Sequence, residues 1–231
     1  RVAARNDSVF IVWHDSRNED LLDIYGNYSN DSGANFGKNV KVSDGKAGTR
    51  QAMPDAGILP DGRPCAVWHD DRDGGLAVRF ARSDDFGLTF LPSVNVSESS
   101  SRVQRSDPRV DGDSGGNVSV VYRDNSLGSY NVMYAVSRDF GNTFTPSMRV
   151  DPPGLEGSSE SVDVTLSPNG TAMVAYDDIN MLGDRDIYLS SLIDRPPLVR
   201  INAPVDGATI SGLTVIAGNA SYPELSAVLK K

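Results

Sequence analysis

Several features that define other protein classes are scarce or absent in these 231 residues. Cys65 is the only cysteine, so no internal disulfide can form. No apolar stretch reaches the roughly 18 residues that a membrane-spanning helix needs, so we expect no membrane span in this segment. The sequence starts at Arg1 and carries no signal peptide. We therefore expect that part of a longer parent chain is missing.

Positively charged residues are also fewer than negatively charged ones. Lys and Arg number 22 against 31 Asp and Glu, a formal net charge of −9. An acidic surface without a Lys/Arg cluster repels a phosphate backbone, which argues against nucleic acid as a partner. The same acidity suits solubility or divalent cations. His14 and His69 are the only histidines, and with one cysteine they supply too few ligands to predict a zinc site.

Turn-forming residues and short apolar runs are abundant instead. The chain has 22 Gly and 13 Pro, and 39% of its residues are hydrophobic, enough for a core. Signals such as Pro60-Asp61-Gly62 separate short runs rich in valine and aromatics, and no segment keeps a helical period. The composition therefore predicts an all-β protein with many short strands.

A unit of about 54 residues occurs four times. Its leading aromatics are spaced 55, 54 and 54 residues apart: Trp13, Trp68, Tyr122 and Tyr176. A second aromatic follows each first one after 12 residues: Tyr25, Phe80, Tyr134 and Tyr188. A short alternating strand closes each unit, at residues 40–42, 94–96, 148–150 and 199–201. Three landmarks in one period indicate a repeat architecture.

Each unit offers about four short strands, which describes a β-propeller of four-stranded antiparallel blades. Stacking such sheets buries faces that one sheet cannot bury alone. We predict four blades in residues 1–202, divided at about 1–54, 55–107, 108–161 and 162–202. Residues 203–231 form a separate β tail.

The first three units also share the pattern Ser-x-Asp-x-Gly-x-Thr/Asn-Phe. Its defining residues are Ser29, Asp31, Gly33 and Phe36, then Ser83, Asp85, Gly87, Thr89 and Phe90, then Ser137, Asp139, Gly141, Thr143 and Phe144. The carboxylate can accept backbone N–H groups across a tight hairpin, and glycine supplies a positive φ. We expect the phenylalanine to pack the turn onto the apolar face of the blade.

This pattern resembles the Asp box, or bacterial neuraminidase repeat, of sialidases and related propellers. The resemblance covers residues 1 to about 202 and implies that the boxes lie on the outer rim, in a structural role. The fourth unit departs from it, because Ile193 replaces the aspartate and Arg195-Pro196-Pro197 follow without a glycine. We expect its fourth strand, at 199–201, to close the blade through a proline-shaped connection. In the first unit, one extra residue between Tyr25 and Ser29 predicts a local bulge.

The tail after Pro204 contains two short strand patterns. It resembles the opening strands of an immunoglobulin-like module, but too few residues remain for a complete sandwich. The sequence predicts either a truncated module, strands packed on the propeller, or strands that pair with a neighbouring molecule.

Charged positions near the leading aromatics are the candidate ligand or cation sites: Asp15, Arg17, Asp70, Arg72, Asp124 and Asp178. Carboxylates bind Ca²⁺ and sugar hydroxyls, so calcium is the one cofactor that the pattern permits. The alternative, which we favour, is that each aspartate caps its own turn.

Resemblance to sialidases also implies a catalytic set of three arginines, a tyrosine paired with a glutamate, and an acid/base aspartate. An Arg-Ile-Pro motif near the first blades is absent. The available tyrosine–glutamate pairs would combine Tyr130 or Tyr134 with Glu156 or Glu160. No position matches the catalytic motif of the family. We therefore assign no catalytic residue.

Seven Asn-x-Ser/Thr sites either arise by chance in a chain rich in Asn and Ser or indicate a glycosylated protein outside the cell or on its surface: Asn6, Asn27, Asn30, Asn95, Asn117, Asn169 and Asn219. The leading hypothesis is a non-enzymatic scaffold, adhesion or glycan-binding module whose partners are glycans or surface proteins. The C-terminal part of a sialidase-like glycoside hydrolase is the first alternative. A surface-layer or filament subunit is the second.

Overall fold

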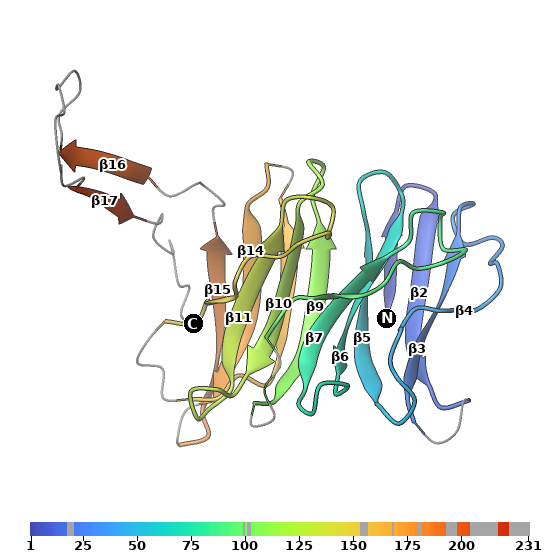
Figure 1. The fold of residues 1–231 in the computed structure, drawn as a ribbon, viewed down its shortest axis with the longest axis horizontal. Helices are drawn as coiled ribbons and strands as arrows, with labels where there is room; N and C mark the ends of the chain where they lie inside the picture. The colour runs from blue at the N-terminus through green and yellow to red at the C-terminus, as the bar shows by residue number, and fades with distance from the viewer. Residues whose placement is uncertain are drawn as a thin grey trace, which may run out of the picture.

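The computed structural model describes residues 1–17, 21–98, 100, 103–152, 157–167, 169–179 and 182–192, and the backbone of 198–203 and 217–221. All the regular elements in these ranges are β-strands (Figure 1). The leading-aromatic runs form the second strand of each sheet, as the repeat predicts.

Three sheets have four antiparallel strands, and each runs in chain order. Blade 1 comprises β1 (Val2–Arg5), β2 (Ser8–Asp15), β3 (Asp23–Ser29) and β4 (Val40–Lys41). Blade 2 comprises β5 (Gln51–Ile58), β6 (Pro64–Asp70), β7 (Ala77–Arg82) and β8 (Val94–Asn95). Blade 3 comprises β9 (Arg105–Gly112), β10 (Val118–Asp124), β11 (Asn131–Ser137) and β12 (Met148–Arg149). β5 and β9 begin a few residues before the approximate blade boundaries predicted at 55 and 108.

Blade 4 has three strands among the described residues: β13 (Val162–Leu166), β14 (Ala172–Ile179) and β15 (Arg185–Leu192). The strand predicted at 199–201 lies in β16 (Leu198–Ala203), which pairs with β17 (Ala217–Ser221) in a separate two-stranded sheet. The prediction that it closes the blade is therefore wrong. Without the Asp and Gly of the other units, the sequence does not encode the tight turn that returns the chain to the third strand, and proline supplies no N–H for the ladder.

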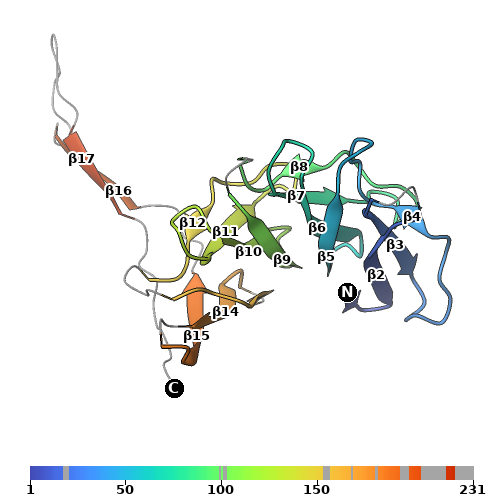
Figure 2. The same ribbon diagram turned by 90° about the horizontal axis from the view of Figure 1, so that it is seen from below.

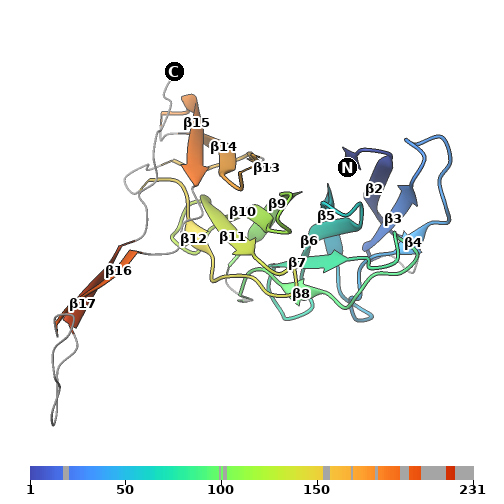
Figure 3. The ribbon, with the colours of Figure 1, turned by 90° about the horizontal axis from the view of Figure 1, so that it is seen from above.

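The four blades stand side by side in an arc. Figures 2 and 3 show β5, β9 and β13 toward its concave side and β4, β8 and β12 along its convex side. The arc does not close into a ring within the described part of the chain. This is the arrangement of propeller blades around an axis, with the first strand of each blade innermost.

Apolar side chains fill the junctions between neighbouring blades. Three separate clusters lie between blades 1 and 2, blades 2 and 3, and blades 3 and 4. The leading aromatics Trp68, Tyr122 and Tyr176 are buried, each in the junction with the preceding blade. Burial between sheets rather than within one sheet is what the repeat predicts.

The bulge predicted in blade 1 is absent. Strands β2 and β3 pair without interruption from Val9–Ser29 to Asp15–Asp23, so the extra residue lies in the turn between them. As a result, Tyr25 pairs with Trp13, whereas its counterpart in the sequence repeat, Phe80, pairs with Val67. The second aromatic therefore does not occupy one structural position in all blades.

Irregularities occur instead in the first strands of blades 2 and 3. The pairing of β5 with β6 shifts between Ala52 and Asp55, and Met53 has a φ of 52°. The β9–β10 pairing shifts in the same way, and Asp107 has a φ of 48°. Both positions are 54 residues apart, so the bulge is a feature of the repeat that side-chain patterning did not reveal.

Candidate functional site

Two opposite edges of the arc carry the residues that the sequence singles out. The edge at which the second strands end bears Asp15, Asp70, Asp124 and Asp178, and we call it the carboxylate edge. The edge at which the third strands end bears the three Ser-x-Asp-x-Gly turns, and we call it the turn edge. They are opposite because the second and third strands of each blade are antiparallel.

The three turns repeat one hydrogen-bond network. The serine hydroxyl donates to the aspartate at 2.7 Å in each copy and accepts the glycine N–H at 3.0, 2.7 and 2.8 Å. The Asn or Thr four residues after the aspartate donates both its backbone N–H and its side chain to the carboxylate. These bonds hold the pKa of Asp31 at about 2, chiefly through the Asn35 side chain. The three carboxylates thus accept their hydrogen bonds from donors within their own turns.

Each turn also has a second residue in the left-handed region. Ser32, Phe86 and Phe140, which precede the glycines, have φ values of 59°, 56° and 58°. The sequence reading placed positive φ only at the glycines. Two left-handed residues in succession form the hairpin turn that matches the twist of the flanking strands.

The phenylalanines of the turns pack across blade junctions. The Phe90 ring of blade 2 lies 5.7 Å from that of Phe10 in blade 1, and Phe144 of blade 3 lies 5.3 Å from Phe80 in blade 2. Phe36, in blade 1, has no preceding blade beside it among the described residues and is 41% exposed. The turn therefore pins its blade to the preceding one, a partner that the sequence did not identify.

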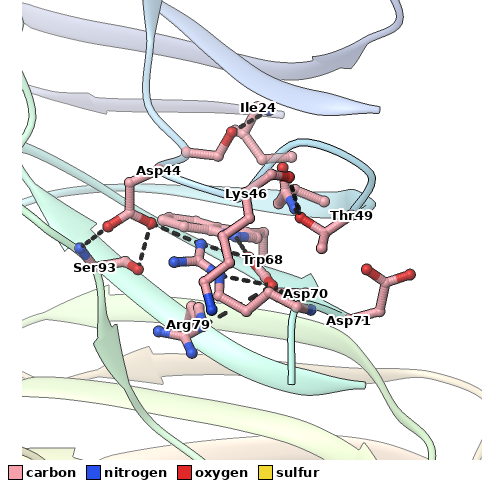
Figure 4. A network of polar contacts seen from close by, with 12 residues as sticks. Ile24, Asp44, Lys46, Thr49, Trp68, Asp70, Asp71, Arg79 and Ser93 are labelled. Carbon is pink, nitrogen blue, oxygen red and sulfur yellow. Dashed lines mark hydrogen bonds and ion pairs between the residues drawn. The ribbon is translucent and has the colours of Figure 1, made fainter. Parts of the chain in front are cut away.

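On the carboxylate edge, Asp70 is enclosed by donors (Figure 4). Its Oδ1 accepts the backbone N–H and the Nε of Arg72, both at 2.9 Å. Oδ2 accepts the indole N–H of Trp68 at 3.2 Å and Arg72 Nη2 at 2.6 Å. Four donors occupy the acceptor sites of the carboxylate, so Asp70 works as a turn cap and anchors Arg72.

Arg72 extends this network to blade 1. Its Nη2 donates to Asp44 Oδ1 at 2.7 Å, and Asp44 also accepts the N–H and hydroxyl of Ser93 at 2.8 and 2.7 Å (Figure 4). Asp44 follows β4, whereas Ser93 precedes β8. The network therefore joins the outer strands of two blades, and sequence reasoning missed Asp44 and Ser93.

Asp15 repeats the arrangement in a more open setting. It accepts Trp13 Nε1 at 3.2 Å, and the backbone N–H and Nη2 of Arg17 at 2.8 and 2.5 Å. These bonds, led by the Arg17 side chain, lower the pKa of the Asp15 carboxyl. Arg17 also lies over the Tyr25 ring, 4.2 Å from its centre.

The other two candidate aspartates have different surroundings. Asp124 accepts the Ser126 N–H at 2.7 Å and pairs with Arg105 at 2.9 Å. Burial, followed by the charge of Asp151, raises the pKa of Asp178. Among the described residues, no group of three or more His, Cys, Asp or Glu side chains is arranged to hold a metal ion. A calcium site at these positions stays a prediction.

His69 is a polar group buried at the same edge. It is 6% exposed, neither ring nitrogen has a hydrogen-bond partner, and burial lowers its pKa to about 4. The imidazole is therefore neutral at pH 7. His14, in the preceding blade, is exposed.

The tyrosine and glutamate pairs considered for catalysis have other partners. Tyr134 is buried and shares a hydrogen bond of 2.8 Å with Ser119. Glu160 pairs with Arg185 at 2.5 Å, and Arg185 also reaches Asp177 at 3.1 Å. Tyr130 lies under Arg123, 5.0 Å from the guanidinium carbon to the ring centre. Glu156 lies outside the described residues.

A further repeated contact escaped the sequence reading. The residue after each Val-x-Val or Met-x-Val strand accepts the N–H of the third strand, at 3.0 Å for Ser43–Ile24, 2.8 Å for Ser97–Val78 and 2.7 Å for Asp151–Val132. Their 54-residue spacing is the signal that would have revealed them. Inner strands are also joined across junctions, because Asp55 accepts the Val110 N–H at 3.1 Å and Asp111 the Leu166 N–H at 2.7 Å.

Similarity to known proteins is found in solved structures and not in sequence comparisons. No protein-family model matches the sequence, and no curated protein matches it. Similar structures include a protein of unknown function from Dyadobacter fermentans DSM 18053, with TM-score 0.58, 16% identity, and 81% of this chain and 58% of that chain covered. They also include the Hadza microbial sialidase Hz136 (0.50, 14%, 75% and 43%) and the α-L-arabinanase of Penicillium chrysogenum complexed with arabinobiose (0.52, 16%, 80% and 67%).

The chain therefore has a sialidase-like β-propeller fold. It spans only about half the length of the first two of these structures. At such identities the likeness defines the fold and assigns no reaction. Separately, none of the described residues forms a helix long and apolar enough to cross a membrane.

Proposed function

We propose that the chain is a non-enzymatic, carbohydrate-binding β-propeller module that acts outside the cell or on its surface, and that its three Ser-x-Asp-x-Gly turns are Asp boxes. The shared fold with a sialidase and an arabinanase supports a carbohydrate-related role. The commitment of Asp15 and Asp70 to their own arginines and tryptophans supports binding rather than hydrolysis, because a general acid or nucleophile needs a carboxylate that can reach the substrate.

The observation that carries the proposal is the Arg123–Tyr130 pair on the carboxylate edge. The Arg123 guanidinium lies over the Tyr130 ring, binds Asp107 and donates to the Ser159 carbonyl at 3.0 Å. An arginine fixed by several partners can present its remaining donors to hydroxyl groups at little entropic cost. The half-buried tyrosine beside it adds a flat apolar surface of the kind that contacts sugar C–H groups.

Glycan-array screening, followed by calorimetric titration of the hits, tests this assignment. We expect Arg123→Ala and Tyr130→Ala to weaken glycan binding by about tenfold or more, the loss of a contact worth about 1.4 kcal/mol. Lys38→Ala, an exposed position beyond the first Ser-x-Asp-x-Gly turn, is the matched control and should leave the affinity unchanged. The absence of any glycan ligand, or binding that survives both substitutions, would contradict the proposal.

The second candidate, part of a sialidase-like glycoside hydrolase, has its own supporting observation. Glu160 and Asp177 are held together on the carboxylate edge by Arg185, and Asp177 accepts the Glu160 N–H at 2.8 Å. Glycoside hydrolases use paired carboxyl groups. Hydrolysis of a fluorogenic sialoside or arabinoside by the wild-type chain, lost in Glu160→Gln, would favour the enzyme over the binding module.

A further inference from the structure

The outward face of blade 1 exposes positions that every other blade buries. Strand pairing makes Ile11 equivalent to Ala66, Val120 and Val174, since each of these lies opposite a residue equivalent to Val2 in the first strand. The three equivalents of Ile11 are fully buried, whereas Ile11 is 36% exposed and Val2 is 66% exposed. With Phe36, these side chains form what we call the leading face, which in blades 2–4 packs on the preceding blade.

The outward face of blade 4 likewise exposes positions that the other blades bury, here against the following blade. Pairing makes Ile187 equivalent to Ile24, Val78 and Val132. Those three are fully buried against the following blade, whereas Ile187 is 61% exposed. Ala175, equivalent to the buried Val12, Val67 and Val121, is exposed as well. We call this surface the trailing face.

A polar contact of the junction between blades 2 and 3 also has its two positions on these faces. Between blades 2 and 3, Asp55 accepts the Val110 N–H. Asp163, which is exposed, holds the Asp55 position on the trailing face, and Val2 holds the Val110 position on the leading face. The two faces are thus complementary in apolar positions, as the two sides of each internal junction are, and in one hydrogen bond of the kind found between blades 2 and 3.

We propose that the chain associates head to tail with a second copy of itself, the trailing face of one copy stacking on the leading face of the next. Ile187 and Ala175 then meet Ile11, Val2 and Phe36, and Asp163 accepts the Val2 N–H. Because the two faces differ, the contact is heterologous, so it yields a ring if the arc closes and a filament if it does not. The occupant is a second copy because the chain itself carries both halves of the junction.

Sedimentation velocity and light scattering of the whole chain over a concentration series test the proposal. We expect the weight-average mass to rise from 24.8 kDa to about twice that value or more. Ile11→Arg should abolish association by placing a charge in the leading face, and Ile187→Arg should do so in the trailing face. Leu88→Arg, which is 73% exposed on the turn edge, is the control and should associate as wild type does.

A mixture of the two variants separates this geometry from a symmetric dimer. Each variant alone should be monomeric, but Ile11→Arg keeps its trailing face and Ile187→Arg keeps its leading face, so equal amounts should form a dimer and stop there. Val2→Asp and Ala175→Arg serve as second variants for the two faces, and circular dichroism verifies that all variants fold. A monomeric wild type overturns the proposal, as does a mixture that stays monomeric. If the chain stays monomeric but binds separately produced propeller blades, the two faces are an interface with another protein, and the proposal is overturned.

Discussion

Trp68 donates its indole N–H to Asp70 at 3.2 Å, and Trp13 makes the same bond to Asp15 one blade earlier, also at 3.2 Å. The tryptophan fills the junction with the preceding blade while its polar atom is satisfied two residues downstream within the same strand. The aspartate thereby serves packing and turn capping at once. This double use accounts for the Trp-x-Asp pairs of blades 1 and 2.

Removing the Asp70 carboxylate should destabilise the chain strongly. Asp70→Ala leaves the Arg72 guanidinium and the Trp68 indole without their buried acceptor, a loss of about 3–5 kcal/mol for a buried pair. Asp15→Ala should destabilise the chain much less, because its arginine is more exposed and the pair is screened by solvent. Urea unfolding monitored by tryptophan fluorescence measures both. Equal effects would contradict the structural role assigned to Asp70.

Ser-x-Asp-x-Gly turns that share the same hydrogen-bond network should contribute equally to the free energy of unfolding. Ser83→Ala and Ser137→Ala each remove one hydroxyl that bonds both the aspartate and the glycine N–H, so each should cost about 1–2 kcal/mol. Ser191 lies 54 residues after Ser137 but pairs with Met173, one position away from the register of Ser137, and Ile193 follows it where the other units have aspartate, so Ser191→Ala should cost less than about 0.5 kcal/mol. A loss at Ser191 as large as at Ser83 would show that the serine acts without its carboxylate partner.

His69 should make stability depend on pH between its two pKa values. Its ordinary pKa of 6.5 falls to about 4 in the fold, so the unfolded chain binds the proton more readily between these pH values. Stability contributed by the neutral ring is present above pH 6.5 and is lost as the pH falls toward 4, on the order of 3 kcal/mol in total.

Chemical denaturation of wild type and His69→Gln at several pH values checks this. Between pH 6.5 and 4, the free energy of unfolding of His69→Gln should fall less steeply with decreasing pH than that of the wild type. His14→Gln, at an exposed site, should keep the wild-type slope. Parallel pH profiles for all three chains would contradict the burial of a neutral His69.

Gly26 should tolerate no side chain. A Cβ at this position would lie 2.5 Å from the Phe10 ring, which fills the space that Phe80 fills in blade 2, so Gly26→Ala should cost about 1–3 kcal/mol by overpacking. Gly37→Ala, where the nearest atom lies at 3.8 Å, is the control and should be close to neutral. Thermal unfolding of both variants gives the comparison, and a neutral Gly26→Ala would contradict the register found for β3.

The sequence was sufficient for features that depend on neighbouring residues. The 54-residue period, the second strands of all four blades and the three Ser-x-Asp-x-Gly turns follow from local side-chain chemistry, since each turn satisfies its own bonds within eight residues. The capping role favoured for Asp15 and Asp70 was readable for the same reason, as their partners lie two residues away.

Contacts between blades were decided only by the tertiary structure. The position of Tyr25 depends on one extra residue in a turn, and a shift of one residue sends a strand side chain to the other face. The partner of Phe90, the Asp44–Arg72 link and the pairing of β16 with β17 join residues tens of positions apart. Which apolar positions are buried likewise depends on whether another blade covers them, and this is why Ile11 and Ile187 are exposed although the repeat gives them the same character as their buried equivalents.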